Sequence, residues 1–412
     1  MNDNNKPGES IHHLSFTTHN SLVPRLRFPE FQDTGGWDNC NLGDISTVVR
    51  GGSPRPIDGF ITKDNSGLNW LKIGDVNKDD KYVTKTQEKV RVEALSKTRE
   101  VHPDDLILSN SMSFGRPYLM KIKSCIHDGW IAITEIEESV EREYLYYLIF
   151  SPASQSYFLD NAAGSGVLNL NAEIIKSLPI AFPAQTEQQK IADCLSSLDA
   201  LIAAQADKIN ALKTRKKGLM QQLFPREGET APRLRFPEFR DAGEWTSEKL
   251  IKYFPRIRNG FVGTASPYYV RDGVPYLQGK NIKQGRIDDT GLVRISHEFH
   301  KNQAKSQLRE GDILMVQSGH VGECAVVGQD FKNGNCHALI VLTPLEGTSS
   351  YFFKHYFYAP PGQALIAKVT TGNTIAHILA TDLRVMNVKV PKLPEQQKIA
   401  DCLSSLDALI AA

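Results

Sequence analysis

The 412-residue chain lacks the features that mark membrane, secreted and zinc-binding proteins. No run of eighteen apolar residues occurs in it, which argues against a membrane-spanning helix. Its six cysteines form no Cys-x-x-Cys pair, and this usage fits reduced thiols in a cytoplasmic protein better than disulfides or a zinc site. Residues 1–23 lack the basic and apolar segments of a signal peptide. We therefore expect a cytoplasmic protein with a polar N-terminal tail and no metal site.

An excess of charge of one sign is also missing, because 48 basic residues stand against 47 acidic ones and the formal net charge is +1. A strongly basic chain would indicate nucleic-acid binding, and this composition does not. Any affinity for DNA must come from local patches or from a partner that supplies phosphate contacts. The length suffices for two or three domains with cores of their own.

Catalytic motifs are absent or incomplete. The histidines of His297-Glu298-Phe299-His300 are three positions apart, whereas a zinc protease needs four, so this segment is interpreted as a solvated helix start. Pro103-Asp104-Asp105 lacks the Glu-x-Lys of a nuclease site and is interpreted as a turn before a buried strand. The sequence therefore predicts no catalytic residues and no bound cofactor.

What the sequence does contain is an internal repeat. The eighteen residues EQQKIADCLSSLDALIAA occur at 187–204 and again at 395–412. A second element repeats with the same offset of 208, since residues 24–37 and 232–245 agree at 11 of 14 positions. The segments between these elements, 38–185 and 246–393, share almost no gapless identity. A constant frame with two different inserts suggests a scaffold that presents two different recognition surfaces.

The repeated eighteen residues predict a helix, because they contain no glycine or proline. The first helix should continue to about Phe224, before Pro225. Apolar residues recur along it alternately four and three positions apart, as in a coiled-coil seam. The expected seam residues are Ile191, Leu195, Leu198, Ile202, Ile209, Leu212, Leu219 and Leu223. If the two helices pair antiparallel, residues 395–412 cover 205–222, and the stretch 187–204 keeps an apolar stripe that is open to another subunit or to self-association.

The two inserts predict one α+β fold used twice. Strand candidates in the first are 70–76, 105–108, 118–122 and 130–134, followed by a helix near 141–160 and a strand near 178–182. The second repeats this order with strands near 276–282, 312–315, 338–341 and 385–390 and a helix near 350–358. The expected organisation is a tail (1–23), a first domain (24–185), a helix (186–224), a linker with a second domain (225–393), and the start of a second, shorter helix (394–412).

Polar side chains that can read base edges gather in the loops of both domains. Arginine pairs best with guanine, and asparagine or glutamine pairs best with adenine. The first-domain candidates are Arg50, Ser53, Arg55, Asn110, Ser111, Ser113 and Arg116. The second-domain candidates are Arg258, Asn259, Lys280, Asn281, Gln317, Ser318, His320 and Asn373. Any one of them could simply solvate a loop, and what favours DNA contact is their recurrence at equivalent places.

Two further features concern phosphate groups. Gly51 and Gly52, between the first arginines, are expected to let the backbone approach a phosphate. The basic run Lys213, Arg215, Lys216 and Lys217 has two interpretations: a solvated helix end with a favourable dipole contact, or a phosphate contact with DNA that lies along the helix.

Together these features resemble the DNA specificity subunit of type I restriction–modification systems. The resemblance rests on the paired frame, on the EQQKIADCLSSLDALI helix after a strand that ends in proline, and on three short motifs. These motifs are Arg-Gly-Gly-Ser-Pro at 50–54, Gly-Asp-Ile-Leu at 311–314 and Gly-x-x-Gly at 319–322. The resemblance covers nearly the whole chain after about residue 22.

The resemblance implies two target-recognition domains, each reading half of a split, asymmetric DNA site, with an antiparallel coiled coil that sets the unread spacer. It implies a non-catalytic subunit that docks two modification subunits, which methylate adenine at N6, and restriction subunits through them. S-adenosylmethionine, ATP and Mg would be bound by those partners. The shorter second helix departs from this pattern.

Two other interpretations are a divergent enzyme that cleaves DNA alone and an assembly scaffold that reads no sequence. DNA cleavage by the purified chain without partners would favour the enzyme. A complete complex without sequence preference would favour the scaffold. The divergence of two matched surfaces on one frame favours the DNA-reading interpretation.

Overall fold

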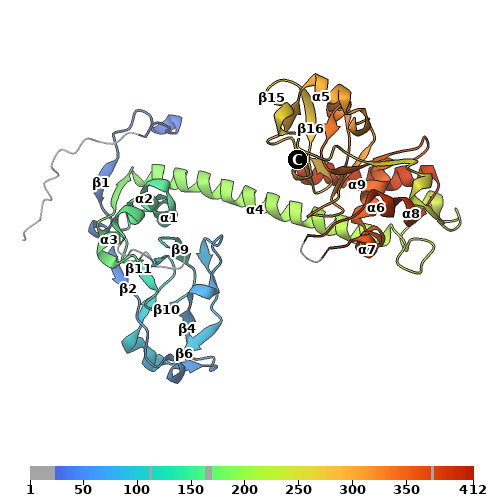
Figure 1. Ribbon diagram of the computed structural model, residues 1–412. Coiled ribbons are helices and arrows are strands. Elements are labelled where there is room, and N and C mark those ends of the chain that lie inside the picture. Colours follow the sequence, from blue (N-terminus) through green and yellow to red (C-terminus); the bar gives the residue numbers. More distant parts are fainter. Residues whose placement is uncertain (1–23, 111–113, 163–168, 373–374) are drawn as a thin grey trace, which may run out of the picture. The chain divides into compact units, whose positions relative to one another are not determined.

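The computed structural model describes residues 24–110, 114–162, 169–372 and 375–412. The chain divides into two compact units, residues 1–202 and 203–412. One continuous helix, α4 (Gln185–Gln222), contributes its first half to unit 1 and its second half to unit 2 (Figure 1). Two mixed helix–sheet domains with a long helix between them are the fold class that the sequence predicts.

Unit 1 is built on two five-stranded sheets. The central sheet has the order β2-β11-β8-β9-β5, with strands Thr47–Arg50, Trp130–Thr134, Leu106–Ser109, Pro117–Met120 and Tyr82–Val83. The second sheet has the order β3-β6-β4-β10-β7, with strands Ile61–Thr62, Glu88–Val90, Leu68–Leu71, Ser124–Ile126 and Arg99–Val101. These strands confirm the candidates near 70, 105, 118 and 130.

Alternate residues of the central strands point to two different cores, because successive side chains of a strand face opposite sides of a sheet. Leu106 and Leu108 pack with residues of helices α1 (Arg142–Phe150), α2 (Pro152–Asn161) and α3 (Ala172–Lys176). Ile107 packs with residues of the second sheet, among them Leu71. The sheet is thus covered on both faces, which explains why its inner strands β8, β9 and β11 are buried at nearly every position.

The single helix expected near 141–160 is two helices. Ser151 ends α1 and caps α2, since its Oγ accepts a hydrogen bond from the Ser154 N–H at 3.3 Å. Pro152 occupies the first turn of α2, where a missing N–H costs nothing. The chain then closes through β12 (Pro179–Phe182), which pairs antiparallel with β1 (Asp38–Asn41).

Unit 2 repeats this architecture. Its central sheet is β14-β23-β20-β21, with strands Arg256–Asn259, Leu339–Thr343, Ile313–Val316 and Cys324–Val326. The second sheet is β15-β19-β16-β22, with strands Tyr269–Val270, Val293–Ile295, Val274–Leu277 and Asn335–Cys336. Unit 2 also contains the hairpin β17–β18 (Ile282–Lys283, Arg286–Ile287) and the closing strand pair β13–β24 (Thr246–Lys249, Asn387–Val390). Its shorter helices are α5 (His297–Asn302), α6 (Ser350–Tyr358), α7 (Pro360–Val369) and α8 (Ala380–Val385). The start of α5 at His297 confirms the helical interpretation of that segment.

The repeated frame makes the same contacts in both units. Arg27 forms a buried ion pair with Glu187 at 2.6 Å, and Arg235 forms the matching pair with Glu395 at 2.6 Å. The next repeat residue, a glutamine, accepts a hydrogen bond from the backbone just before α1 in unit 1 and α6 in unit 2. These contacts explain why the frame is constant: it fixes each domain to its own copy of the helix.

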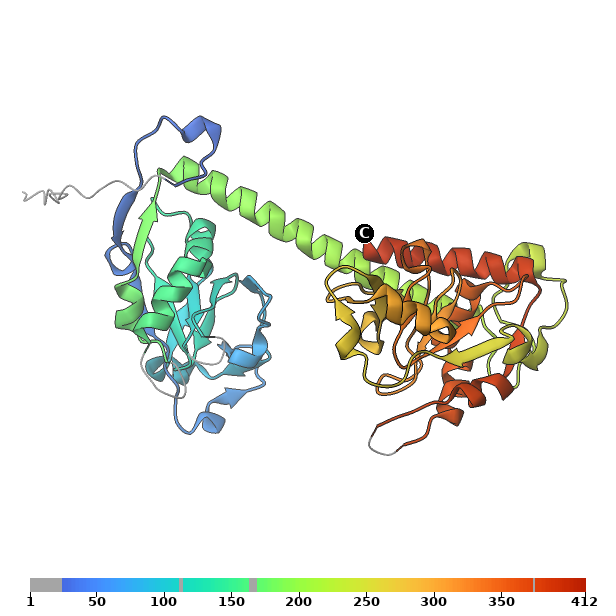
Figure 2. The same cartoon turned by 45° about the horizontal axis from the view of Figure 1, so that its top comes forward.

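In unit 2, the second helix α9 (Leu393–Ala411) lies antiparallel to the second half of α4 (Figure 2). Lys216 bonds Asp407 at 2.5 Å, and Leu223 shares a core with Ile399 and Leu403. The expected antiparallel pairing is therefore confirmed. The later seam residues Ile209, Leu212, Leu219 and Leu223 are partly or fully buried, whereas Leu198 and Ile202 in the first half are 50% and 67% exposed. Among the described residues, no helix combines the length and apolarity that a membrane crossing requires.

Candidate nucleic-acid interface

The sheet topology gathers the predicted loops at one edge of each domain. β2 and β8 both pair antiparallel with β11, so their carboxyl ends lie at the same edge as the start of β11. Arg50 and Asn110 stand at those carboxyl ends, at the last residue of β2 and just after β8. In unit 2, β14, β20 and β23 repeat this pairing and bring Asn259 and Gln317 to the equivalent places.

In unit 1, four of the predicted residues converge on Asp128, in the turn between β10 and β11. Arg50 Nε and Asn110 Nδ2 both donate to the Asp128 carbonyl oxygen, at 2.9 and 3.0 Å. Ser53 Oγ and an Arg55 amino group donate to the Asp128 carboxylate at 2.8 and 3.1 Å. One turn thus collects side chains from two separate parts of the sequence, residues 50–55 and Asn110.

Asp128 is a charged anchor for this cluster. The hydrogen bond from Ser53 and the charge and hydrogen bond of Arg55 hold the pKa of Asp128 below its usual value, so it is ionised at neutral pH. The neighbouring His127 is neutral, because burial lowers its pKa and its Nδ1 accepts a hydrogen bond from the Gly129 N–H at 2.8 Å. Asp128 is therefore negative and His127 neutral, so the positive charges of this cluster are those of Arg50 and Arg55.

Gly51 and Gly52 are needed for packing inside the domain. A Cβ on Gly51 would lie 2.1 Å from the His127 carbonyl oxygen, and one on Gly52 would lie 2.7 Å from the Lys97 carbonyl oxygen. Both glycines are therefore required by close packing of backbone against backbone within the domain, and a phosphate contact at this place stays a prediction.

The arginines of the cluster keep donors free for a ligand. Arg50 uses only Nε, and within the described residues its two terminal amino groups have no partner. The Arg55 side chain is 80% exposed and borders a cleft of about 880 Å³ that also contains Trp70 and Lys63. Both guanidinium groups can therefore make further hydrogen bonds while Asp128 holds them in place.

Arg116 sits differently from the other first-domain candidates. Its guanidinium lies 4.6 Å from the ring centroid of Phe150 and 5.9 Å from that of Tyr118, which is cation–π geometry. Its Nε is buried and has no partner within the described residues. Ser111, Ser113 and Asn373, which were also predicted to contact DNA, lie outside the described residues.

Two second-domain candidates are engaged inside the protein. Arg258 bonds Thr343, Gln307, Lys305 and the buried Asp312, so its donors are already used. Asn281 is 1% exposed, accepts from the Gln278 N–H and donates to the Asp288 carbonyl oxygen, which closes a turn before β17. Both side chains therefore stabilise the fold of unit 2.

The remaining second-domain candidates are accessible. Asn259, Lys280, Ser318 and His320 are exposed, and Gln317 is partly buried. The turn that corresponds to His127-Asp128 carries His337 and Ala338, so unit 2 has no carboxylate at the anchor position. The same edge therefore presents different chemical groups in the two units, and the DNA contacts themselves stay predictions.

Sequence reasoning missed Asp128 and His127, although they organise the unit 1 cluster. The available signal was the His-Asp-Gly turn directly before the buried strand β11, at the edge to which the predicted loops belong. Among the described residues, no group of three or more histidine, cysteine or acidic side chains is placed to hold a metal ion.

Comparison with known proteins agrees with this architecture. The family model described as "Type I restriction modification DNA specificity domain" matches residues 34–214 and 248–412. The MjaVIII specificity subunit of Methanocaldococcus jannaschii is 22% identical over 402 residues, covering 93% of this chain and 88% of that protein. The EcoBI specificity subunit of Escherichia coli is 20% identical over 329 residues, covering 75% and 68%.

Solved structures show the same fold. The S subunit of a type I restriction–modification system from M. genitalium superimposes with a TM-score of 0.59 at 13% identity, over 95% of this chain and 93% of that one. A chain from a study of complex assembly in the type I system gives a TM-score of 0.54 at 17% identity, over 94% and 93%. Because the family model matches two stretches that together span most of its length, this chain belongs to the DNA specificity subunits of type I restriction–modification systems.

Proposed function

We propose that this chain reads a split, asymmetric DNA target, with unit 1 recognising one half-site and unit 2 the other. The strongest support for this proposal is that the repeated frame is constant, whereas the residues at the matching sheet edges of the two units differ. Equivalent positions carry Arg50 and Asn259 at one strand end, and Asn110 and Gln317 at the other. Because guanidinium and carboxamide groups pair with different bases, such changes alter the base that is read.

The hydrogen bonds of Arg50 suit direct reading of a base. Its Nε is fixed to the Asp128 carbonyl oxygen, which leaves the two terminal amino groups side by side. A pair of donors in this arrangement matches the O6 and N7 acceptors of guanine in the major groove. Asp128 acts as a positioning residue, since it holds the arginine without using the donors that a base would take.

The chain is proposed to be non-catalytic and to dock modification subunits, with restriction subunits bound through them. In this proposal S-adenosylmethionine, ATP and Mg belong to the partners. A complex assembled with its modification subunits should select one split target from a random duplex pool and methylate adenine within it. Selection of no sequence would favour the scaffold interpretation, and cleavage by the purified chain alone would favour the enzyme interpretation.

A partner helix, or a second copy of the chain, is proposed to dock on the open first half of α4. Next to it lies a cavity of about 430 Å³ lined by Leu26, Phe28, Trp37, Ile191 and Leu195, among others. In unit 2 the equivalent surface, built from the same repeated residues, holds Leu223 and Phe224, which directly follow α4. The occupied surface of unit 2 indicates what the open surface of unit 1 binds, namely an amphipathic helix that is followed by Leu-Phe.

A peptide with the sequence of residues 205–226 tests this docking. The peptide should bind the full chain, and a peptide with both Leu223 and Phe224 replaced by alanine should not. A Trp37→Ala chain should lose peptide binding without losing DNA selection in the complex. Equal binding of both peptides would contradict the proposed docking.

A further inference from the structure

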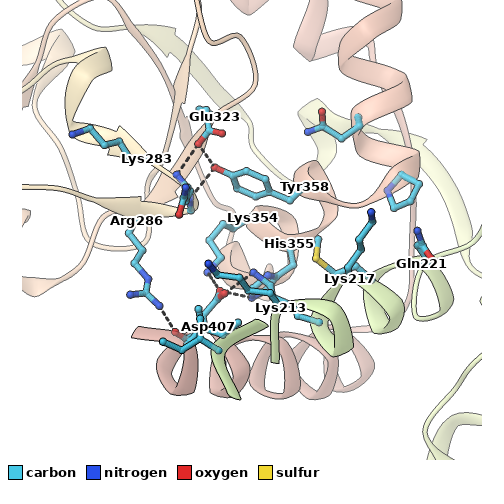
Figure 3. Close-up of a pocket in the computed structure, with 18 residues that line it drawn as sticks. Lys213, Lys217, Gln221, Lys283, Arg286, Glu323, Lys354, His355, Tyr358 and Asp407 are labelled. Atoms are coloured by element: carbon cyan, nitrogen blue, oxygen red, sulfur yellow. Dashed lines mark hydrogen bonds and ion pairs between the residues drawn. The ribbon is translucent and has the colours of Figure 1, made fainter. Parts of the chain in front are cut away.

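Unit 2 contains a groove that no part of the DNA-reading edge explains. It lies between the second half of α4, the β17–β18 hairpin, α6 and the end of α9, with a volume of about 910 Å³ (Figure 3). Its cationic lining residues are Lys213, Lys216, Lys217, Lys283, Arg286 and Lys354. Only two carboxylates, Glu323 and Asp407, line it as well, so it carries an excess of four positive charges.

Both carboxylates are occupied by groups of the protein. Asp407 bonds Lys216 at 2.5 Å and Lys354 at 3.1 Å. Glu323 accepts the Tyr358 hydroxyl at 2.7 Å and the Gln284 N–H at 2.8 Å. His355, beside Asp407, is neutral because burial lowers its pKa to about 3. The acidic side chains are thus used in holding the walls together and cannot neutralise the remaining cations.

The remaining cations approach the groove from two elements. Lys213 and Lys217 are one helical turn apart on α4, are exposed, and have no hydrogen bond or ion pair within the described part of the chain. Lys283 and Arg286 come from the hairpin, where Lys283 is 60% exposed in its pair with Asp288 and Arg286 donates to the Asp407 carbonyl oxygen. Lys283 therefore has a counter-ion, whereas Lys213 and Lys217 have none within the described residues. Like charges that lie one helical turn apart without counter-ions repel each other, and this favours a polyanion as the ligand of the groove.

We infer that this groove binds the phosphate backbone of a nucleic acid duplex, away from the edge that reads bases. The inference rests on the proposed function, because it gives the bound DNA a second contact with unit 2. Phosphates fit better than an acidic peptide, since separate lysine ammonium groups on a rigid helix match the regular charges of a backbone and make no demand on sequence. The interpretation of the basic run as a solvated helix end gives Lys213 and Lys217, which have no ion pair within the described residues, no role in the groove.

Charge removal on two faces of α4 provides the test. The groove variant is Lys213→Gln with Lys217→Gln. The matched control is Lys208→Gln with Arg215→Gln, which removes the same charge from the opposite face of the same helix. A Lys213→Arg, Lys217→Arg chain restores the charge. Each full-length chain is titrated with a fluorescent duplex between 50 and 200 mM salt, and thermal unfolding verifies that each variant folds.

Loss of two phosphate contacts should lower the slope of log affinity against log salt by about 1.8, at about 0.9 per contact. The control and the arginine variant should keep the wild-type slope. Equal loss in groove variant and control, no change in either, or no duplex binding by the wild-type chain at 50 mM salt would each overturn the inference.

Two additional probes separate other anions from DNA. In one outcome, tripolyphosphate or a polyglutamate peptide stabilises the wild-type chain but not the groove variant, while the salt slope of DNA affinity is the same in both. That outcome would show that the groove binds a small polyanion or an acidic protein, and the inference would be wrong. If the groove variant lowers the slope but the wild-type complex shows no sequence preference, the backbone site stands and the proposed function fails.

Discussion

The two copies of the eighteen-residue repeat are identical in sequence and differ in environment. Leu198 is 50% exposed in the first copy, whereas its counterpart Leu406 is 8% exposed in the second. Leu201 and Leu409, at another matched position, are exposed in both copies, at 65% and 52%. The helix sequence therefore decides which face is apolar, and a neighbouring segment decides whether that face is buried.

The neighbour in unit 2 is the second half of α4 together with Leu223 and Phe224, which directly follow it. Phe224 packs against Trp245 with ring centroids 6.2 Å apart, and the Trp245 Nε1 donates to Glu395 at 3.3 Å. In unit 1 the matching Trp37 lines an open cavity, and its buried Nε1 has no partner within the described residues. The same surface is thus covered in unit 2 and open in unit 1. Comparing matched substitutions in the two units measures how much covering this surface contributes to the free energy of unfolding.

The largest expected effect comes from uncovering the second copy. Phe224→Ala removes a ring that is 1% exposed and should lower the free energy of unfolding of unit 2 by about 3–5 kcal/mol. Urea unfolding followed by circular dichroism, with fluorescence for the tryptophans, should show the loss in the transition that exposes Trp245. A loss below about 1 kcal/mol would mean that α4 does not stabilise the second copy.

Truncating the same leucine in each copy should give unequal effects. Leu406→Ala should cost about 2–3 kcal/mol because it truncates a side chain that is 8% exposed. Leu198→Ala should change the unfolding free energy by no more than about 0.5 kcal/mol, as exposed substitutions usually do. Similar losses in the two variants, measured by urea unfolding, would show that the first copy is covered as well.

A smaller effect concerns acid stability. Burial opposes ionisation of Asp407, but the hydrogen bond from Lys216 and the charges of Lys354 and Lys216 outweigh it and lower the pKa of Asp407. A lowered pKa contributes stability above the unfolded-state value, and that stability is lost as pH falls through the folded value. Asp407→Asn should therefore reduce the drop in unfolding free energy between neutral and acidic pH. The same substitution at the exposed Asp199 serves as the control, and an equal reduction there would contradict the assignment.

The sequence was sufficient for the frame because the signals there are local or exactly repeated. The apolar period of residues 187–224 predicts one long helix, and the repeat offset predicts both its partner and the uncovered half. The break between α1 and α2 lies at Ser151-Pro152, whereas the surrounding residues favour helix on both sides and therefore predict one helix.

The candidate interface was less accessible to sequence reasoning. Asp128 collects Arg50, Ser53 and Asn110 across long stretches of chain, and no local pattern states which turn meets which strand end. Arg258 and Asn281 have the side chains of base readers, but their partners are internal groups that only the tertiary fold brings near. A polar loop residue has the same sequence signature whether it faces DNA or closes a turn.

The central claim is that two matched edges read two different half-sites, and reciprocal substitutions test it most directly. Arg50→Ala and Asn259→Ala are introduced separately into the complete complex, and the preferred bases are determined by selection from a random duplex pool. Arg50→Ala should weaken base preference in one half-site by about 1–3 kcal/mol and leave the other intact, and Asn259→Ala should do the reverse. Loss of preference in both half-sites from either single substitution would contradict the account.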